Sequence, residues 1–273
     1  MRNSGANLGL RFSQLAILAG VFLGWHLLTA PGILPPLYFD DPNRAAFLFG
    51  EPLKVFGRIW NWFSGGDIYR HLWVTLVETL LAFLIGTVSG VAIGIWLALA
   101  PAASAILDPY IKALNAMPRV ILAPIFFVWF GLGIASKVAL GVTLVFFIVF
   151  FNVYQGVREV SPTVLANARM LGMREAQLFR HVYWPAALTW MFSSLHTSVG
   201  FALVGAVVGE YLGSAAGLGY KILEAETGFD VTGVFSGMLI LMLVVIAVDT
   251  LVTMIENRLL VWRPEPQGVT AQG

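Results

Sequence analysis

A few ionisable side chains lie within long apolar segments of this 273-residue sequence, and they are its first candidates for chemistry. Glu78, His196 and Asp249 belong to the apolar segments 73–100, 189–210 and 234–257. Such a group can bind a proton or an ion, or it can pair with a polar neighbour inside the protein. Both interpretations stay open for the two carboxyl groups, and His196 either faces a solute or packs with a hydrogen bond.

Metal, thiol and phosphate chemistry are not predicted. The sequence contains no cysteine, and its four histidines show no paired spacing that would indicate a metal site. The nearest approach to a phosphate-binding loop, residues 213–221, lacks the Gly-x-x-x-x-Gly-Lys-Ser/Thr spacing. The net charge of +1 gives no sign of a nucleic-acid partner. We therefore expect no enzyme activity, metal or cofactor in this chain and no nucleic acid among its partners.

The segments that hold these residues are long and apolar enough to cross a membrane. Charged residues make up 11% of the sequence and the mean hydropathy is +0.82, whereas a soluble domain is about a quarter charged. A spanning helix needs about 20 apolar residues. We predict an all-α membrane protein with about six transmembrane helices, at roughly 13–30, 73–100, 118–133, 136–156, 189–210 and 234–257. The first run is retained, because prolines rather than a small-residue cleavage site follow it.

Lysine and arginine residues are enriched on the cytoplasmic side of such a protein. With the N-terminus in the cytoplasm, the inner ones are Arg2, Arg11, Lys112, Arg119, Arg158, Arg169, Arg174, Arg180, Arg258 and Arg263. The outer ones are then Arg44, Lys54, Arg58, Arg70, Lys137 and Lys221. The excess predicts that both termini are cytoplasmic. No lysine or arginine is evident in the middle of a predicted span.

Two segments have a more particular predicted shape. The third span carries Pro118 and Pro124, which predict a kink that packed neighbouring helices tolerate. Between the first two spans, the spacing of aromatic residues over 47–63 predicts a short helix lying along the outer surface.

Small residues recur at every fourth position in two predicted spans. One stripe in the second span consists of Gly86, Gly90, Gly94 and Ala98. The fifth span carries two stripes, Gly205, Gly209 and Gly213 on one and Ser194, Ser198, Ala202 and Ala206 on the other. Small residues at this spacing let helix backbones approach closely in a membrane. The stripes therefore serve packing within one subunit, a homodimer interface or the wall of a translocation path.

The segment between the fourth and fifth spans, residues 157–188, is far longer than the other predicted inner loops. Pro162 suits a first helical turn capped by Ser161. This helix would end at Gly172, which permits a sharp reversal of the chain. A second helical stretch, 175–183, then leads to Trp184 and Pro185. A helix–glycine–helix element on the inner surface is a shape that a cytoplasmic partner can bind.

This loop resembles the coupling loop of binding-protein-dependent ABC importer permeases. The pattern of that family is Glu-Ala-Ala, three residues, Gly, nine residues, Ile-x-Leu-Pro. Ala168, Gly172 and Pro185 match it in register, and Val182 substitutes for isoleucine. The departures are Ala166 for glutamate, Asn167 for the first alanine and Trp184 for leucine.

Further segments resemble the branch of this family that imports sulfonates, taurine, nitrate and related small molecules. The similarity covers roughly residues 65–264 and is carried by Thr75–Leu76 and by the segments 117–133, 217–219 and 256–264. The resemblance implies a type I ABC importer permease in the bacterial inner (plasma) membrane. From the apolar runs and the distribution of charge we expect a cytoplasmic tail at 1–12, a transmembrane domain at 13–263 that includes the coupling loop 157–188, and a disordered cytoplasmic tail at 264–273.

The partners implied by the resemblance are two cytoplasmic ATP-binding subunits, a second permease copy as a homodimer, and a periplasmic or lipid-anchored solute-binding protein, besides membrane lipid. ATP hydrolysis would take place on the ATP-binding subunits. The residues implied to contact them are Ala166, Asn167, Ala168, Leu171, Gly172, Val182 and Pro185.

A polar solute crossing an apolar wall needs hydrogen-bonding groups, and the expected path residues are Met117, Ser194, His196 and Ser198. Without a cation in the middle of a span, nitrate or a sulfonate is no better supported than a neutral heterocycle such as a pyrimidine. The main alternative is a proton-coupled secondary transporter using Glu78 and Asp249, which would show internal repeats and unwound mid-membrane helices. An intramembrane enzyme and a structural scaffold are further alternatives.

Overall fold

The computed structural model of this protein describes residues 4–29 and 44–259, which form helices joined by short connections, with no strand in these ranges. The helices are α1 (Ser4–Thr29), α2 (Arg44–Phe49), α3 (Pro52–Gly65), α4 (Asp67–Leu99), α5 (Pro101–Ala116), the 3-10 helix η1 (Arg119–Leu122), α6 (Ala123–Phe130), α7 (Ile134–Arg158), α8 (Pro162–Met170), α9 (Glu175–Leu178), the π-helical η2 (Phe179–Tyr183), α10 (Trp184–Gly213), α11 (Leu218–Thr227) and α12 (Val231–Leu259). The all-α class is confirmed. The predicted tail 264–273 lies outside the described residues.

Within residues 4–29 and 44–259, five helical segments are long and apolar enough to cross a membrane: α1, α4, α7, the continuous helical stretch Glu175–Gly213 and the apolar part of α12. A sixth crossing requires α5 together with the segment Arg119–Phe130, and these two meet at a bend of 90°. The prediction of about six spans is confirmed, with one of them broken.

The predicted third span, 118–133, is wrong in its form. Helix α6 has 8 residues and is therefore about 12 Å long, too short for a hydrocarbon core of about 30 Å. Helix α5 precedes it, in a segment where the sequence predicts an inner connection. Met117 ends α5 with a ψ of 132°, because a residue before proline is sterically disfavoured in the helical region. The chain therefore turns sharply at Met117–Pro118 instead of kinking.

The chain divides into two compact parts, Met1–Val74 with Ser214–Met242, and Thr75–Gly213 with Leu243–Gly273. In the first part the indole of Trp25 donates a hydrogen bond to the carbonyl of Phe49 (3.1 Å), and Arg58 forms an ion pair with Asp230 (2.8 Å). The helix expected over 47–63 is confirmed over Pro52–Gly65 (α3), but its start is wrong: the chain turns at Gly50, whose φ is +66°, and residues 47–49 belong to α2.

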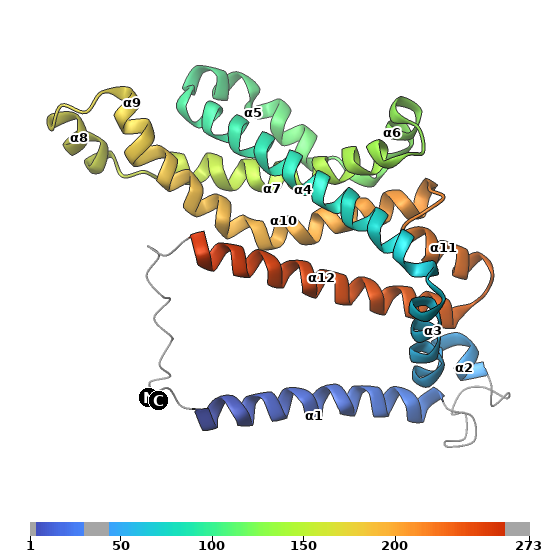
Figure 1. Cartoon of the computed structure of the whole chain (residues 1–273). Coiled ribbons are helices and arrows are strands. Elements are labelled where there is room, and N and C mark those ends of the chain that lie inside the picture. Colours follow the sequence, from blue (N-terminus) through green and yellow to red (C-terminus); the bar gives the residue numbers. More distant parts are fainter. Residues whose placement is uncertain (1–3, 30–43, 260–273) are drawn as a thin grey trace. The chain divides into compact units, whose positions relative to one another are not determined.

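The core of the second part forms where α4 and α10 pack against α7, and Figure 1 shows α7 and α10 side by side. A Cβ atom added at Gly90 of α4 would lie 2.9 Å from the carbonyl oxygen of Phe146 in α7. Gly205 of α10 lies directly against Gly141 of α7, and Gly209 lies against Lys137. Glycines from the two glycine-containing stripes of the three predicted thus face a neighbouring helix of the same chain, which confirms packing within one subunit for these two stripes.

Candidate functional site

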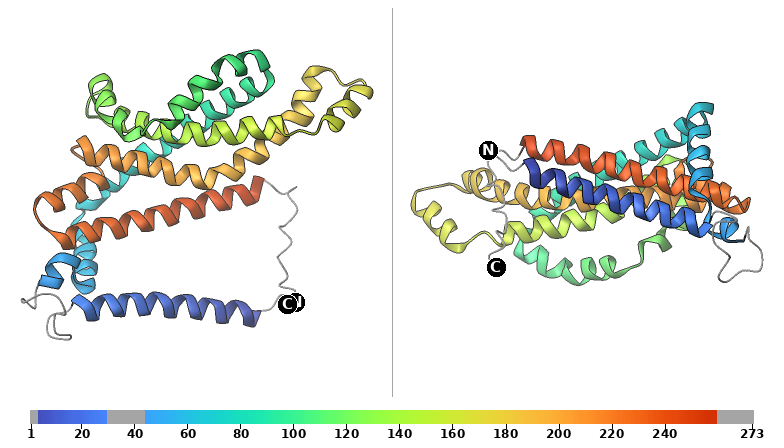
Figure 2. Two further views of the ribbon diagram at one scale, coloured as in Figure 1. Left: turned by 180° about the vertical axis from the view of Figure 1, so that it is seen from behind. Right: turned by 90° about the horizontal axis from the view of Figure 1, so that it is seen from below.

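Residues 157–188 run from the end of α7 through α8, α9 and η2 into the start of α10 and extend beyond the end of α7; we call this segment the docking loop. Figures 1 and 2 show α8 at its far end from three directions. Helix α8 begins at Pro162 with Ser161 as the preceding residue, as the sequence predicts. The side chain of Ser161 forms no capping hydrogen bond, so proline at the first position, with its fixed φ, accounts for where the helix starts.

Helix α8 ends in a Schellman turn. The amide of Gly172 donates to the carbonyl of Arg169 (2.9 Å), and the amide of Met173 donates to the carbonyl of Ala168 (3.1 Å). Gly172 has a φ of +79°, a left-handed conformation that other L-residues adopt only with strain. No heavy atom lies within 4 Å of a Cβ added at Gly172, so the backbone conformation, rather than crowding, requires glycine there.

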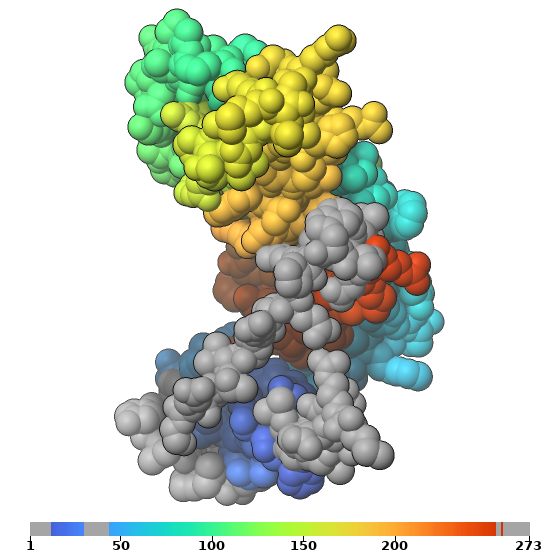
Figure 3. All heavy atoms as spheres, turned by 90° about the vertical axis from the view of Figure 1, so that its left-hand side faces the viewer, coloured from blue at the N-terminus to red at the C-terminus, as the bar shows by residue number. Residues whose placement is uncertain are grey.

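The tip of the docking loop exposes apolar side chains. Met170 is 80% exposed and Leu171 is 81% exposed. In Figure 3 the atoms of the docking loop, drawn in yellow, lie at the surface that faces the viewer. Ala166 and Asn167 are also exposed, whereas Ala168 is buried within the loop. Most of the expected contact residues are thus exposed, whereas Val182 is partly buried and Ala168 is buried.

The second helical stretch of the docking loop and the fifth span form one continuous helix rather than two elements. Helix α9 passes through η2 into α10, so the helix that contains the fifth span begins at Glu175 instead of near residue 189. Val182 lies in η2 and Pro185 in the first turn of α10. A π-helical turn of this kind is a local irregularity in a helix that is frequent at functional sites.

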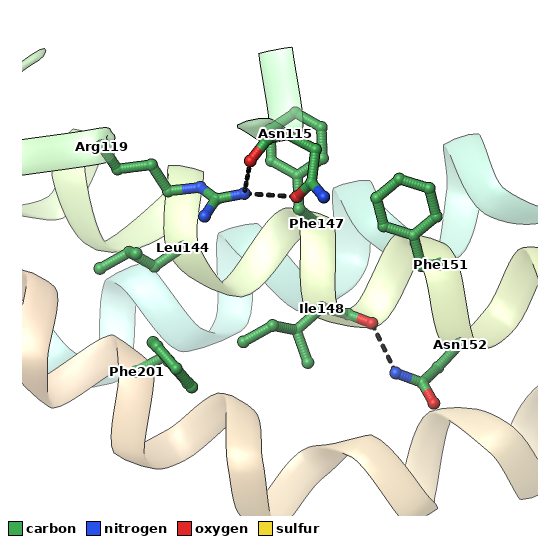
Figure 4. Close-up of a pocket in the computed structure, with 8 residues that line it drawn as sticks. All are labelled: Asn115, Arg119, Leu144, Phe147, Ile148, Phe151, Asn152 and Phe201. Carbon is green, nitrogen blue, oxygen red and sulfur yellow. Dashed lines mark hydrogen bonds between the residues drawn. The ribbon is translucent and has the colours of Figure 1, made fainter. Parts of the chain in front are cut away.

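A cavity of about 290 Å³, open to the surface of the chain, lies along the middle of α7 between Leu144 and Asn152. Figure 4 shows the residues that line it, which come from α5, η1, α7 and α10: Asn115, Arg119, Leu144, Phe147, Ile148, Phe151, Asn152 and Phe201. Most of the wall is aromatic or aliphatic, while one guanidinium and two amides supply its polar groups.

Arg119 brings a positive charge to this cavity. Its Nη2 donates to the backbone carbonyl of Asn115 (3.3 Å) and to the side-chain oxygen of Asn115 (2.5 Å), and its Cζ lies 5.0 Å from the centre of the Phe147 ring. Phe147 is near the midpoint of α7. Arg119, which the sequence assigns to the inner side, therefore lies beside the middle of a helix that is long and apolar enough to cross a membrane. Sequence reading missed it because the break after Ala116 moves Arg119 away from the end of a span.

None of the four predicted path residues lines the cavity. Met117 lies at the break between α5 and η1, two residues from Arg119. Ser194 and Ser198 are buried in α10, where Ser194 donates to the carbonyl of Met191 (2.7 Å). His196 forms a hydrogen bond with Asp249 (2.9 Å) and both side chains are partly exposed, which agrees with the interpretation of Asp249 as a paired carboxyl group.

A buried polar cluster joins α4, α7 and α10. Glu78, Lys137 and Glu210 are each 0–1% exposed, and all three interact electrostatically. Thr75 donates to the carboxylate of Glu210 (2.6 Å), and Lys137 also donates to the carbonyl of Leu132. The pairing interpretation of Glu78 is thus supported. Sequence reading did not identify Glu210, although a lone carboxyl group at the end of an apolar segment is a signal that could have done so.

The apolar helices, the broken span and the projecting docking loop together describe a multi-pass membrane protein with the fold of a transport permease. Residues 90–261 match the family described as the binding-protein-dependent transport system inner membrane component. The chain belongs to this family, so it is an ABC importer permease of the inner membrane and not an enzyme. This membership also decides against a secondary transporter and a scaffold, although a broken span is present.

Two relatives and one solved structure support this assignment. The chain is 33% identical over 254 residues to a Bacillus subtilis (strain 168) protein named as an aliphatic sulfonates transport permease, covering 93% of this chain and 88% of the relative. It is 32% identical over 217 residues to a formylaminopyrimidine transport permease of Halalkalibacterium halodurans, covering 80% and 86%. An inward-facing structure of the MetNI methionine ABC transporter superposes with a TM-score of 0.60 at 18% identity, over 70% of this chain and 94% of the other. This last similarity concerns the fold.

Proposed function

We propose that this chain moves a small solute into a bacterial cell by using ATP hydrolysed on separate cytoplasmic subunits. The observation that carries this proposal is the docking loop, whose tip exposes Met170 and Leu171 on a short helix closed by Gly172. Full burial of such a side chain against a partner contributes about 1.5–3 kcal/mol. Two neighbouring apolar residues on a projecting turn therefore form a compact binding element for an ATP-binding subunit.

The expected contact residues have different parts in this proposal. Leu171 enters a groove of the partner, and the exposed Ala166 and Asn167 lie at the rim of the contact. The buried Ala168 packs inside the loop and acts on the partner only through the position of α8. Val182 and Pro185 lie where η2 joins α10, so a displacement of α8 reaches the membrane helix through this continuous segment.

The proposed topology follows from the number of crossings. If α5 and α6 together form one span, four crossings separate the N-terminus from the docking loop, and six separate it from the C-terminus. Because both numbers of crossings are even, both termini and the docking loop lie on the same side of the membrane. That side is the cytoplasm, since the docking loop binds a cytoplasmic ATPase in this proposal. The transmembrane domain then covers 13–263, with the segment 1–12 as an inner tail.

The full transporter in this proposal contains two copies of the chain, two ATP-binding subunits, and a periplasmic or lipid-anchored protein that delivers the solute. The relatives carry names that refer to an aliphatic sulfonate and to a formylaminopyrimidine. We accordingly assign a small sulfonate-, taurine- or nitrate-like solute or a small heterocycle as the cargo class.

Purification of the tagged full chain from its native host tests this function. We expect an ATP-binding subunit with a phosphate-binding loop to co-purify, and replacement of Gly172 by leucine to reduce its recovery at least fivefold while the chain still inserts. The reason is that leucine at a φ of +79° distorts the turn that orients Leu171.

Gly66→Leu is the matched control. Gly66 has a φ of +87° and no heavy atom within 4 Å of an added Cβ, so the substitution brings the same backbone strain outside the docking loop. Recovery of the subunit should be unchanged in this variant. Purification of the chain alone, with uptake in ATP-free vesicles that a proton uncoupler abolishes, would refute the proposal.

A further inference from the structure

The cavity against α7 is lined by a cation, Arg119, that has no counterion in the described part of the chain. Among the described residues, no carboxylate forms an ion pair with Arg119, whose hydrogen bonds go to a backbone carbonyl and to an amide oxygen. Its Nε atom is buried and has no hydrogen-bond partner. The Arg119 side chain is partly buried. An arginine is charged at every physiological pH, and a charge partly withdrawn from water is stabilised by a partner of opposite sign. An anion is therefore the group that would complete this site.

The position of the cavity agrees with a solute as the source of that anion. Helix α7 has 25 residues and is about 37 Å long, so its midpoint is roughly 18 Å from either end. A lipid headgroup would have to leave the membrane surface to reach Arg119. The break at Met117–Pro118 lies beside the same cavity, and irregular backbone at membrane depth is tolerated where it is buried in protein or lines a water-filled cavity.

The wall of the cavity limits the size and form of the ligand. A volume of about 290 Å³ is at the lower end of the range for small-molecule sites, about 300–1,000 Å³. Phe147, Phe151 and Ile148 offer apolar surface, while the amides of Asn115 and Asn152 offer hydrogen bonds beside the guanidinium. These groups suit a solute with one oxyanion and a short carbon chain.

We propose that this cavity is a recognition site on the translocation path, in which Arg119 binds the oxyanion of a small sulfonate or carboxylate and Phe147 and Phe151 contact its carbon chain. This inference rests on the proposed import function and extends it by naming the residue that selects an anionic over a neutral cargo. An anionic solute supplies the counterion that Arg119 lacks among the described residues, so the site favours anionic solutes over neutral ones of equal shape.

Equilibrium dialysis of radiolabelled ethanesulfonate against the full chain and its co-purified subunits tests this site in phosphatidylcholine nanodiscs. We expect saturable binding that unlabelled ethanesulfonate and propionate compete and the neutral ethyl methyl sulfone does not. Arg119→Met should weaken binding at least tenfold. Lys112→Met, which removes an exposed charge from α5 outside the cavity, should leave it unchanged. The absence of saturable binding to the wild type, or equal binding by Arg119→Met, would overturn the inference.

A measurement on the unaltered chain covers the case in which Arg119→Met does not fold. Ethanesulfonate should protect Arg119 from phenylglyoxal at least threefold, as read on its peptide by mass spectrometry; unchanged reactivity contradicts the site. In phosphatidylglycerol nanodiscs the affinity should change less than threefold, and complete loss would assign the anion to a lipid headgroup instead. Co-purification of the ATP-binding subunit is scored separately, so failure of the anion site and failure of the import function give different results.

Discussion

Lys137 supplies the positive charge of the buried cluster that joins α4, α7 and α10, and its replacement by methionine gives the sharpest test of how this core is held together. The side chain is 0% exposed, interacts electrostatically with Glu78 and Glu210, and has its Nζ 5.4 Å from the centre of the Phe127 ring. Methionine has nearly the same length and volume, so the substitution removes the charge without creating a large cavity.

The expected loss of unfolding free energy for Lys137→Met is about 3–5 kcal/mol, since removal of one partner leaves buried charge uncompensated. Glu78→Gln alone should cost about 1 kcal/mol or less, because Lys137 keeps Glu210 as a partner and the glutamine amide, of the same size, can still donate a hydrogen bond to Glu210. In the double variant only Glu210 stays, with its bond from Thr75 (2.6 Å). The double variant should therefore be more stable than the sum of the single effects by at least about 1 kcal/mol.

Unfolding of the full chain by sodium dodecyl sulfate in mixed micelles measures these free energies. Lys112→Met is the control, because Lys112 is exposed and forms an i,i+4 pair with Asp108 (2.7 Å); its loss should change stability by about 0.5 kcal/mol or less. A loss below about 1 kcal/mol for Lys137→Met, or strictly additive effects in the double variant, would refute the view that the three charges act as one unit.

Two further substitutions test the packing and the docking loop. Gly90→Ala should reduce the unfolding free energy by about 1–3 kcal/mol, since the new Cβ meets the Phe146 carbonyl at 2.9 Å; Gly57→Ala, with no heavy atom within 4 Å, should be neutral or stabilising in the same titration. Leu171→Asp should lower recovery of the ATP-binding subunit at least fivefold in a pull-down, while Phe229→Asp, at an equally exposed position, should not; equal recovery from both would contradict a role for Leu171.

Local rules account for the parts that the sequence predicts well. Pro162 and Gly172 bound α8 through their own backbone preferences, which need no tertiary information. The stripe at Gly86, Gly90 and Gly94 indicates a close helix contact from its period alone, and these glycines face α7 in the structure. The family resemblance in the docking loop rests on the same short-range features, and membership of the family confirms it.

Tertiary arrangement decides the parts that the sequence does not predict. The apolar run over 118–133 indicates a span by its hydropathy, yet the residue before a proline leaves the helical region, and at Met117 this steric effect wins over apolarity. Lys137 and Glu210 lie near the ends of their predicted spans, where the free-energy cost of a charged side chain in the membrane is small. A charge at such a position therefore does not indicate a buried partner. Their pairing becomes visible only when three helices are brought together.

The break in the third span and the cation beside it are two consequences of one local sequence, Met117-Pro118-Arg119. Proline ends α5 and leaves the last carbonyl groups of that helix without intrahelical donors. Arg119 reaches back to one of them, the carbonyl of Asn115 (3.3 Å), as basic residues do at the C-terminal ends of helices. Its planar guanidinium carries five donors, so a single residue can hold the broken helix end and still offer hydrogen bonds to an anion in the cavity. A lysine, with one ammonium point charge, does not combine these two tasks as well, which gives a physical reason for arginine at this position.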